Sequence, residues 1–492
     1  MLRPWDLNIR VVRSAQTAIY LQICQAILEE IRRGRIKPGA ALPGTRELAE
    51  SLGVNRKTVV EAYDELTAQG WLVPERTRGT FVSAELPDIG RLENRNGGKA
   101  GMPDRPDFRL RGTGPGLSLV FASDGVLTFD DGAPDTRLIP VDELARAYRS
   151  GLGLASRRNR LGYGDPRGSL ALREAVSTML NADRGLTTTP ENICLVRGSQ
   201  MGIYLAARIL VGPGDTVAVE ELSYPPAREA FRATGAEVAA VGLDGHGMRV
   251  DELEKLCRRQ RVRAVYVTPH HQFPTTVLMK PERRLRLMAL AEQFGFAIVE
   301  DDYDHEFHFV HRPMLPLASA DRGGKVIYIG SMSKLLSPSL RIGYIAAPVP
   351  VVDRAAAEIT IIDRQGDPAT ETAVADLMES GAIKRHTRRV MRVYAERREL
   401  LGDLLLKAFG DLVSFTLPEG GLALWVQFND GIDLAALADK AGAEGLRFLP
   451  GQSFAASGQP VQAARLGFGS LDASELAEAV RRFARLVRGK NA

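Results

Sequence analysis

Cysteine is scarce in this chain of 492 residues, which holds only three. Cys24, Cys194 and Cys257 are odd in number, stand far apart and form no Cys-x-x-Cys pair, which argues against a disulfide framework and a zinc site. The sequence also lacks any run of about 18 uncharged apolar residues, and its first residues lack the apolar core of a signal peptide. These absences predict a cytoplasmic protein without a membrane segment or a metal centre.

Strong charge of one sign is also missing. The formal net charge is +4 at pH 7, and residues 1–85 hold twelve basic residues against ten acidic ones. Such a balance neither demands nor excludes a polyanionic partner, so any DNA-binding surface must come from the local placement of basic side chains. A chain of this length exceeds what one hydrophobic core supports, which predicts two or three domains.

Residues 17–84 show the pattern of a winged helix-turn-helix. Isoleucines at positions 19, 23, 27 and 31 predict the apolar face of a first helix, and Leu48 and Leu52 mark a short second one. Asn55 is placed to cap a third helix, on which Val59 faces inward. Two short strands, residues 71–73 and 80–82, enclose a polar turn and complete the predicted wing.

The predicted DNA contacts lie at the start of the third helix and at the wing. Arg56, Lys57 and Thr58 follow Asn55 on the outward face, where a recognition helix touches base edges and phosphates in the major groove. Arg78 stands at the tip of the wing, within reach of the adjacent minor groove. The partner predicted for this segment is therefore double-stranded operator DNA.

The remaining chain divides into an N-terminal arm, a linker and a second domain. Residues 1–16 form the arm, and residues 85–116, rich in Pro, Gly and Asn, are predicted to be an extended, mobile linker. Within residues 117–492, strand-like runs alternate with helical patterns, at residues 193–196, 216–219, 264–267, 297–299 and 326–329. The alternation predicts an α/β fold with a mainly parallel sheet, and a smaller α+β lobe is expected from about residue 360.

The segment from residue 330 to residue 344 carries the most informative side chain, Lys334. A lysine that forms a Schiff base needs an aldehyde cofactor that is held by its phosphate. Ser331 and Ser333 supply hydroxyl donors and Arg341 supplies a fixed cation around that lysine. The segment therefore predicts a site for pyridoxal phosphate.

A second phosphate-binding signal lies at residues 198–200. Gly198, Ser199 and Gln200 follow a predicted strand and open an apolar helix, whose free backbone amides suit an anion. A simple helix cap is the alternative for this Gly-Ser start. Both readings place a helix N-terminus at a strand end, where open α/β sheets bind ligands.

Three further side chains suit the cofactor ring. Asp301 is placed to pair with a protonated pyridine nitrogen, and Tyr303 to donate to the phenolic oxygen of the ring. Tyr224 follows another strand and is placed to stack on the ring. The alternatives are a metal-binding or solvated acidic run at residues 300–304, and a buried core tyrosine at position 224.

Together these motifs resemble the fold-type I aminotransferases over nearly all of residues 117–492. The resemblance implies that Lys334 holds pyridoxal phosphate and that Arg465 receives a substrate carboxylate, with a surface ion pair as the alternative for Arg465. It also implies that Tyr163, in the segment of residues 163–168, reaches the cofactor phosphate of a partner subunit. A homodimer is therefore expected.

Residues 17–83 resemble the GntR winged-helix family, through residues 42–49, which include Arg46, and residues 55–59. The fusion of that module to an aminotransferase-like domain defines the MocR-type regulators, which the whole chain resembles. Phe273 stands where most aminotransferases have Asn, and Pro226 stands where regulators that respond to γ-aminobutyrate carry Arg. The resemblance therefore implies that one hydrogen bond to the phenolic oxygen of the cofactor is lost here, and it does not imply a response to γ-aminobutyrate.

These observations predict a transcriptional regulator that binds operator DNA and senses a small amine, an amino acid or pyridoxal phosphate itself. Sensing requires no net chemistry. One rival is a working aminotransferase with an appended DNA-binding module, because the catalytic set is complete enough to allow turnover. Another is a regulator whose second domain only dimerises and keeps a vestigial cofactor site.

Overall fold

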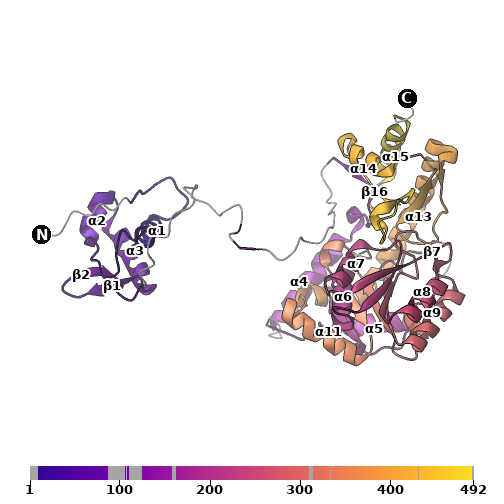
Figure 1. Ribbon diagram of the computed structural model, residues 1–492, viewed down its shortest axis with the longest axis horizontal. Coiled ribbons are helices and arrows are strands. Elements are labelled where there is room, and N and C mark those ends of the chain that lie inside the picture. Colours follow the sequence, from indigo (N-terminus) through magenta and orange to yellow (C-terminus); the bar gives the residue numbers. More distant parts are fainter. Residues whose placement is uncertain are drawn as a thin grey trace. The chain divides into compact units, whose positions relative to one another are not determined.

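The computed structural model describes residues 9–86, 106, 108–109, 125–157, 162–309, 314–332, 334–429 and 431–489. Its internal contacts divide the chain into two units, Met1–Gly112 and Thr113–Ala492 (Figure 1). Most of the predicted linker and Ser333 lie outside the described residues. No helix within those ranges is both long and apolar enough to cross a bilayer.

The first unit is a winged helix-turn-helix, as the sequence predicted. Its elements are α1 (Ile19–Arg32), α2 (Thr45–Leu52), α3 (Arg56–Ala68), β1 (Leu72–Glu75) and β2 (Gly79–Val82). Ile23 and Ile27 of α1 and Val59 of α3 are fully buried, so the predicted apolar faces form the core. The two strands pair in an antiparallel manner from Leu72 opposite Val82 to Glu75 opposite Gly79. That pairing extends the strands beyond their predicted ends and shortens the turn of the wing.

The second unit is built on a seven-stranded sheet of order β4-β12-β11-β10-β9-β5-β6. The strands are β4 (Ile193–Val196), β5 (Thr216–Glu220), β6 (Glu237–Val241), β9 (Val262–Val267), β10 (Ala297–Asp302), β11 (Val326–Ser331) and β12 (Gly343–Ala346). All run parallel except β12, which is antiparallel to both of its neighbours. The prediction of a mainly parallel sheet is confirmed.

Helices cover both faces of this sheet. They are α4 (Val141–Arg157), α5 (Leu170–Arg184), α6 (Gly198–Leu210), α7 (Pro225–Arg232), α8 (Val250–Arg259), α9 (Pro281–Phe294), α10 (Leu317–Ala320), α11 (Val349–Ile362) and α12 (Pro368–Glu379), with a small ribbon of β7 (Leu243–Asp244) and β8 (Gly247–Met248). Successive residues of β5 enter opposite cores. Val217 and Val219 pack with residues of α6 and α7, whereas Ala218 packs with residues of α8 and α9. The two-faced burial explains the nearly uninterrupted apolar strands of the sequence.

A smaller lobe follows, with a four-stranded antiparallel sheet of order β13-β14-β17-β16. Its strands are β13 (Val413–Ser414), β14 (Ala423–Phe428), β16 (Leu449–Pro450) and β17 (Ala463–Gly467), and its helices are α13 (Ala382–Phe409), α14 (Leu434–Ala441) and α15 (Ala473–Arg488). Leu424, Leu466 and Phe483 are fully buried in its core. The short strand β3 (Leu127–Thr128) pairs in parallel with β15 (Leu446–Arg447), which attaches the beginning of the second unit to this lobe.

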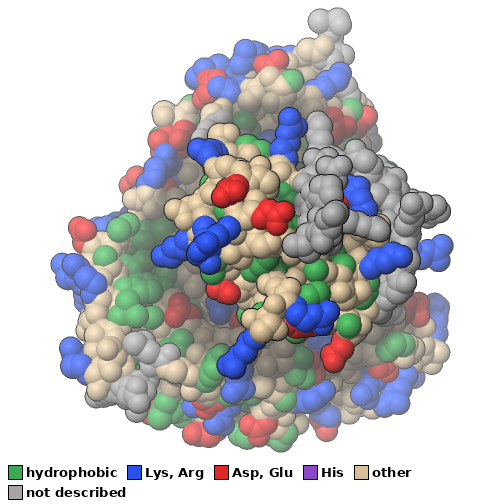
Figure 2. Space-filling model, turned by 90° about the vertical axis from the view of Figure 1, so that its left-hand side faces the viewer, with side chains coloured by type: hydrophobic (Ala, Val, Ile, Leu, Met, Phe, Trp, Pro, Cys, Tyr) green, Lys and Arg blue, Asp and Glu red, His purple; other side chains and the backbone are tan. Residues whose placement is uncertain are grey.

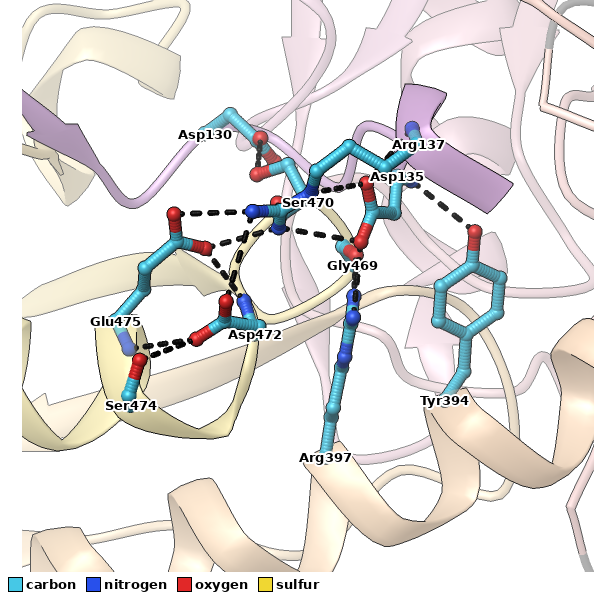
Figure 3. Close-up of polar contacts among 10 residues, drawn as sticks. All are labelled: Asp130, Asp135, Arg137, Tyr394, Arg397, Gly469, Ser470, Asp472, Ser474 and Glu475. Atoms are coloured by element: carbon cyan, nitrogen blue, oxygen red, sulfur yellow. Dashed lines mark hydrogen bonds and ion pairs between the residues drawn. The ribbon is translucent and has the colours of Figure 1, made fainter. Parts of the chain in front are cut away.

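A buried carboxylate fastens residues 130–137 to the small lobe. Asp135 is 4% exposed and accepts hydrogen bonds from Nη2 of Arg397 on α13 and from Nε of Arg137, both at 2.8 Å (Figure 3). Burial alone would disfavour the charge, but the hydrogen bonds from Arg137 and Arg397 outweigh it and lower the pKa of Asp135. The segment is therefore held by a charged contact in which both Asp135 and Arg397 are buried.

Two further contacts extend this attachment toward α15. Arg137 Nη2 donates to Glu475 at 2.9 Å, and the Asp130 carboxylate accepts from the Ser470 hydroxyl (Figure 3). The other oxygen of Asp130 accepts from the amides of Gly132 at 2.8 Å and Ala133 at 2.7 Å. Residues 130–137 therefore have a fixed place against β17 and the start of α15.

Candidate functional site

The ends of β10 and β11 bring the acidic run beside the lysine segment. The two strands pair in parallel, with Asp301 opposite Ile329 and Asp302 opposite Gly330. The sequence analysis placed Glu300, Asp301 and Asp302 after the strand, but pairing with β11 extends β10 to Asp302 and buries all three. A solvated acidic run is therefore wrong. In the described ranges no three His, Cys, Asp or Glu side chains are grouped to hold a metal ion.

Lys334 follows the end of β11 and points at an aromatic ring. Its Nζ lies 4.3 Å from the centroid of the Tyr303 ring. Burial lowers the pKa of Lys334, while the carboxylates of Asp304 and Asp131 act in the opposite direction. A lysine with a lowered pKa is neutral more often, and the neutral amine is the form that attacks an aldehyde.

Asp301 has one satisfied oxygen and one unsatisfied oxygen. Its Oδ2 accepts a hydrogen bond from the Tyr266 hydroxyl at 2.7 Å. Its Oδ1 is buried and has no hydrogen-bond partner among the described residues. Burial raises the pKa of Asp301 to about 7. Because an unpartnered buried acceptor destabilises a fold, this oxygen suits a ligand that carries a donor.

A cradle for an anion lies where α6 begins. Gly198 starts the helix with φ at 74°, and a Cβ added there would lie 2.9 Å from Nη2 of Arg341. A Cβ on Gly343 would lie 2.7 Å from the carbonyl carbon of Gly198, so no larger residue fits at position 343, and the positive φ of Gly198 disfavours a side chain there. Ser199 and Gln200 continue the first turn of α6. A guanidinium beside the positive end of a helix dipole is unfavourable until an anion lies between them.

Phe273 is the centre of an aromatic wall. Its ring makes edge-to-face contacts with Tyr224 at 5.3 Å, Tyr303 at 5.9 Å and Phe454 at 5.4 Å between centroids. The guanidinium of Arg465 lies over the same ring, 4.6 Å from its centroid. Phe273 therefore connects Tyr224 and Tyr303 to the small lobe, to which Phe454 and Arg465 belong.

Arg465 is a buried cation with an unused donor. The residue lies on β17 and is 1% exposed. Its Nε donates to the carbonyl of Asp131 at 2.9 Å and its Nη1 donates to the carbonyl of Pro274 at 2.6 Å. Its Nη2 is buried and has no partner in the described part of the chain, where no carboxylate pairs with this side chain. A surface ion pair is therefore wrong, and the free donor suits a ligand carboxylate.

Several predicted site residues stand apart or are engaged elsewhere. Tyr163 is 81% exposed, lies 5.1 Å from the Arg364 guanidinium and does not reach the site of its own chain. Gln200 donates to the carbonyl of Pro226 at 3.1 Å. Ser331 is buried at the end of β11, and Ser333 lies outside the described residues. The chain therefore brings together Lys334, Asp301, Tyr303, Tyr224, Arg341, Arg465 and the start of α6.

The sequence analysis missed two residues of this site. Tyr266 reads as one apolar member of a strand, and nothing in its local pattern shows that its hydroxyl supports Asp301. Asp131 lies 334 positions from Arg465 along the chain, yet its carbonyl contacts that guanidinium. Only tertiary structure connects such positions.

The start of α3 is organised as predicted. Oδ1 of Asn55 accepts from the amide of Lys57 at 2.9 Å, which confirms the predicted helix cap. Nε of Arg56 donates to the Thr45 hydroxyl at 3.4 Å, so the first turns of α2 and α3 lie together. Arg46 is exposed on the first turn of α2. Free amides and guanidinium groups at these two helix starts suit phosphates.

The wing presents two exposed arginines, Arg76 and Arg78, whereas Thr58 at the start of α3 is less exposed than predicted. Arg78 is exposed, pairs with Glu75 at 2.9 Å and lies 5.2 Å from the Phe81 ring centroid. Thr58 is half-buried. On the side turned to the viewer in Figure 2, Lys and Arg side chains stand in separate groups with Asp and Glu between them.

Both units match known families. Residues 19–82 match the bacterial regulatory proteins of the gntR family. Residues 124–483 match aminotransferase class I and II, and the chain belongs to that family over this range. The whole chain is 30% identical over 468 residues to the probable rhizopine catabolism regulatory protein MocR of Rhizobium meliloti, covering 95% of this chain and 93% of that protein. The chain is a MocR-type transcriptional regulator.

Other relatives agree with this family. The HTH-type transcriptional regulator TauR of Rhodobacter capsulatus is 30% identical over 479 residues, which cover 96% of this chain and 97% of that one. A multiple substrate aminotransferase from Thermococcus profundus superposes with a TM-score of 0.70 at 29% identity, covering 75% and 93% of the two chains. The α-aminoadipate aminotransferase LysN of Thermus thermophilus, complexed with N-(5'-phosphopyridoxyl)-L-leucine, gives 0.69 at 29% identity, covering 74% and 93%. The second unit therefore has the fold-type I aminotransferase architecture.

Proposed function

We propose that the second unit of this regulator binds pyridoxal phosphate and senses a small amine, an amino acid or the cofactor itself. The observation that carries the proposal is the buried, unpartnered Oδ1 of Asp301, which lies in the same site as Lys334. Two further features fit the cofactor's other groups: the Arg341 guanidinium at the start of α6, and the Tyr303 ring against Lys334. The LysN structure supports the assignment because that relative holds a phosphopyridoxyl amino acid on the same fold.

Different residues would bind the phosphate, the ring nitrogen and the ring face of the cofactor. When bound, pyridoxal phosphate supplies an aldehyde that condenses reversibly with amines and a ring that withdraws electrons. Arg341 and the amides of Gly198, Ser199 and Gln200 would bind its phosphate, with Ser331 and Ser333 as further donors. Asp301 would accept from the ring nitrogen, and its raised pKa of about 7 means that it can share that proton. Tyr224 would stack on the ring.

Sensing follows from competition for the aldehyde. An incoming amine would compete with Lys334 for the aldehyde, and Arg465 would bind the carboxylate of an amino acid through its unused Nη2. The protein would exist in a state that can bind the operator and a state that cannot. The effector changes operator affinity only to the extent that it binds these two states unequally, typically by about 1 to 3 kcal/mol. Tyr163, exposed in its own chain, would complete the site of a partner subunit in a homodimer.

Two measurements distinguish this proposal from its rivals: catalytic turnover, and the visible absorbance of the cofactor-loaded protein. Purified full-length protein is loaded with pyridoxal phosphate, and visible absorbance and operator binding are measured while amines and amino acids are added. A regulator shows both responses without multiple turnover of amino acid and keto acid pairs. Sustained turnover would favour the working aminotransferase, and a protein that takes up no cofactor would leave only the dimerisation reading.

Arg465→Ala is expected to weaken a carboxylate-bearing effector by about 2 to 4 kcal/mol, the loss of a buried charge-assisted pair. A spectral titration compares parent and variant with an amino acid and with a simple amine that lacks the carboxylate. Equal losses for both ligands would show that Arg465 supports the lobe instead of binding the carboxylate. If pyridoxal phosphate is itself the effector, Arg341→Ala removes the response and Arg465→Ala does not.

Arg56→Ala and Arg78→Ala are each expected to weaken operator binding, because both guanidiniums are exposed at the proposed DNA surface. A base contact contributes about 1 to 3 kcal/mol, and loss of a phosphate contact lowers the salt slope by about one. Fluorescence anisotropy across a salt titration measures both quantities. Arg33→Ala, an exposed arginine paired with Glu29 on α1, is the matched control and should bind like the parent. Parental binding by both test variants would move the DNA surface elsewhere.

A further inference from the structure

The Asp131 side chain is a half-buried carboxylate with no hydrogen bond or ion pair among the described residues. It belongs to the segment of residues 130–137 that the Asp135 contacts fasten to the small lobe. We propose that the effector is an amino acid with a second basic group and that Asp131 recognises that group. The inference rests on the proposed function, because it concerns the site of Lys334 and Arg465.

The backbone places Asp131 at the site. Its carbonyl accepts from Nε of Arg465 at 2.9 Å, and a Cβ on the next residue, Gly132, would lie 3.4 Å from Nη2 of the same guanidinium. That Nη2 is the free donor proposed for the effector carboxylate. Residues 131 and 132 therefore border the space that an amino acid occupies when its carboxylate reaches Arg465.

The neighbouring carboxylates and Arg465 have observed or proposed partners. Asp301 faces the proposed ring nitrogen, and Arg465 faces the proposed carboxylate. Asp304 pairs with the Nδ1 of His271 at 2.8 Å. Of the carboxylates of Asp131, Asp301 and Asp304, only that of Asp131 makes no hydrogen bond or ion pair with the described residues. A half-buried carboxylate gains more from a partner cation than an exposed one does.

The negative charge of Asp131 reaches the groups around the effector. After burial, Asp131 is the strongest influence that raises the pKa of Tyr224, and it also opposes the lowering of the pKa of Lys334. Both side chains face the effector in the proposed arrangement. A cation on the effector's side chain would therefore lie in a favourable field, whereas a second carboxylate would be repelled.

The aromatic wall suits the stem of such a ligand. Phe273, Tyr224 and Phe454 would pack against the methylene groups of a ligand, and their rings offer a side-chain ammonium no carboxylate. A short diamino acid would match both features, with its methylenes on the rings and its terminal ammonium paired with Asp131. The expected class is a short diamino acid, for which ornithine is the probe.

The test compares two amino acids of nearly the same shape. L-Ornithine and L-norleucine differ in having an ammonium or a methyl group at the end of the chain. Both are titrated into full-length protein loaded with pyridoxal phosphate, and visible absorbance and operator anisotropy are followed. The parent is expected to bind L-ornithine about two to five times more tightly, the value of one partly exposed ion pair.

Two variants assign the preference to the carboxylate. Asp131→Asn keeps the backbone carbonyl that receives Arg465 and should remove the preference while leaving the norleucine affinity unchanged. Asp131→Glu keeps the charge and should retain a preference for L-ornithine. Asp142→Asn, an exposed acid on α4, is the matched control and should behave like the parent.

Three outcomes would overturn the inference. A parent protein that binds both amino acids equally has no site for the second ammonium. Equal weakening of both ligands by Asp131→Asn would show that the carboxylate acts on Lys334 or on local folding. If the spectrum of the loaded protein responds to no amino acid at all, the proposed sensing function fails together with this inference, whereas a response without preference leaves the function intact.

Discussion

Lys334→Ala is expected to abolish covalent attachment of pyridoxal phosphate and the visible absorbance that accompanies it. The Lys334 Nζ is the amine that faces Tyr303 in the same site as the unpartnered oxygen of Asp301. Operator binding by the ligand-free variant should equal that of the parent, because α3 belongs to the other unit. Absorbance spectra and mass spectrometry after borohydride reduction measure the loss.

The matched control is Lys255→Ala, which removes an exposed lysine on α8. It should keep the full covalent yield. The Lys334→Ala protein is expected to retain weak, dialysable cofactor binding, since Asp301 and Arg341 remain in place. A borohydride-reducible adduct that persists in Lys334→Ala would assign the covalent bond to another lysine and would overturn the placement of the site.

Asp135→Ala is expected to destabilise the second unit by about 3 to 5 kcal/mol, the range for removing one partner of a buried ion pair. The substitution leaves the buried guanidinium of Arg397 without its carboxylate and releases Arg137 as well (Figure 3). Urea unfolding followed by circular dichroism reports the shift in midpoint. Asp183→Ala, which removes an exposed partner of Lys384 at 3.0 Å, should cost no more than about 1 kcal/mol.

The effect of Asp135 should depend on pH in a defined direction. Its pKa is lowered in the folded protein, so its contribution is fully present above the carboxyl's unfolded pKa, which is about 4. As pH falls below that value the stability difference between parent and Asp135→Ala should shrink, and it should vanish below the folded pKa. A difference that stays constant from pH 7 to pH 3 would show that lost packing, not lost charge, destabilises the variant.

Local sequence patterns predicted the elements of the winged helix and five strands of the large sheet, but not β6 or β12. The isoleucine spacing of α1 and the cap at Asn55 depend on contacts within a few residues, and both appear as predicted. The apolar strand runs predicted the mainly parallel sheet because burial on two faces leaves its mark on every residue of a strand. The antiparallel direction of β12 was not predicted, since four residues carry no signal of strand direction.

The end of β10 shows what local reasoning leaves open. A solvated acidic run remained an alternative for Glu300, Asp301 and Asp302, because carboxylates are seldom buried. Pairing with β11 draws them into the sheet, where Tyr266 and Tyr328 donate to Asp301 and Asp302 at 2.7 and 2.6 Å. Those donors lie 35 and 26 positions away from their acceptors, so no local pattern reveals them.

The sequence by itself determined the family, the two-unit organisation and the chemical types of the residues proposed to hold the cofactor, because motifs such as residues 330–344 keep those residues at short, fixed spacing. Tertiary structure alone decided which oxygen of Asp301 is left unpartnered, that Phe273 lies beneath Arg465, and that Asp131 borders the same site. These relations join residues that lie 35 to 334 positions apart in the sequence. They depend on how the small lobe packs against the strand ends. Burial there shifts the pKa values of Asp301 and Lys334 and leaves Nη2 of Arg465 without a partner among the described residues.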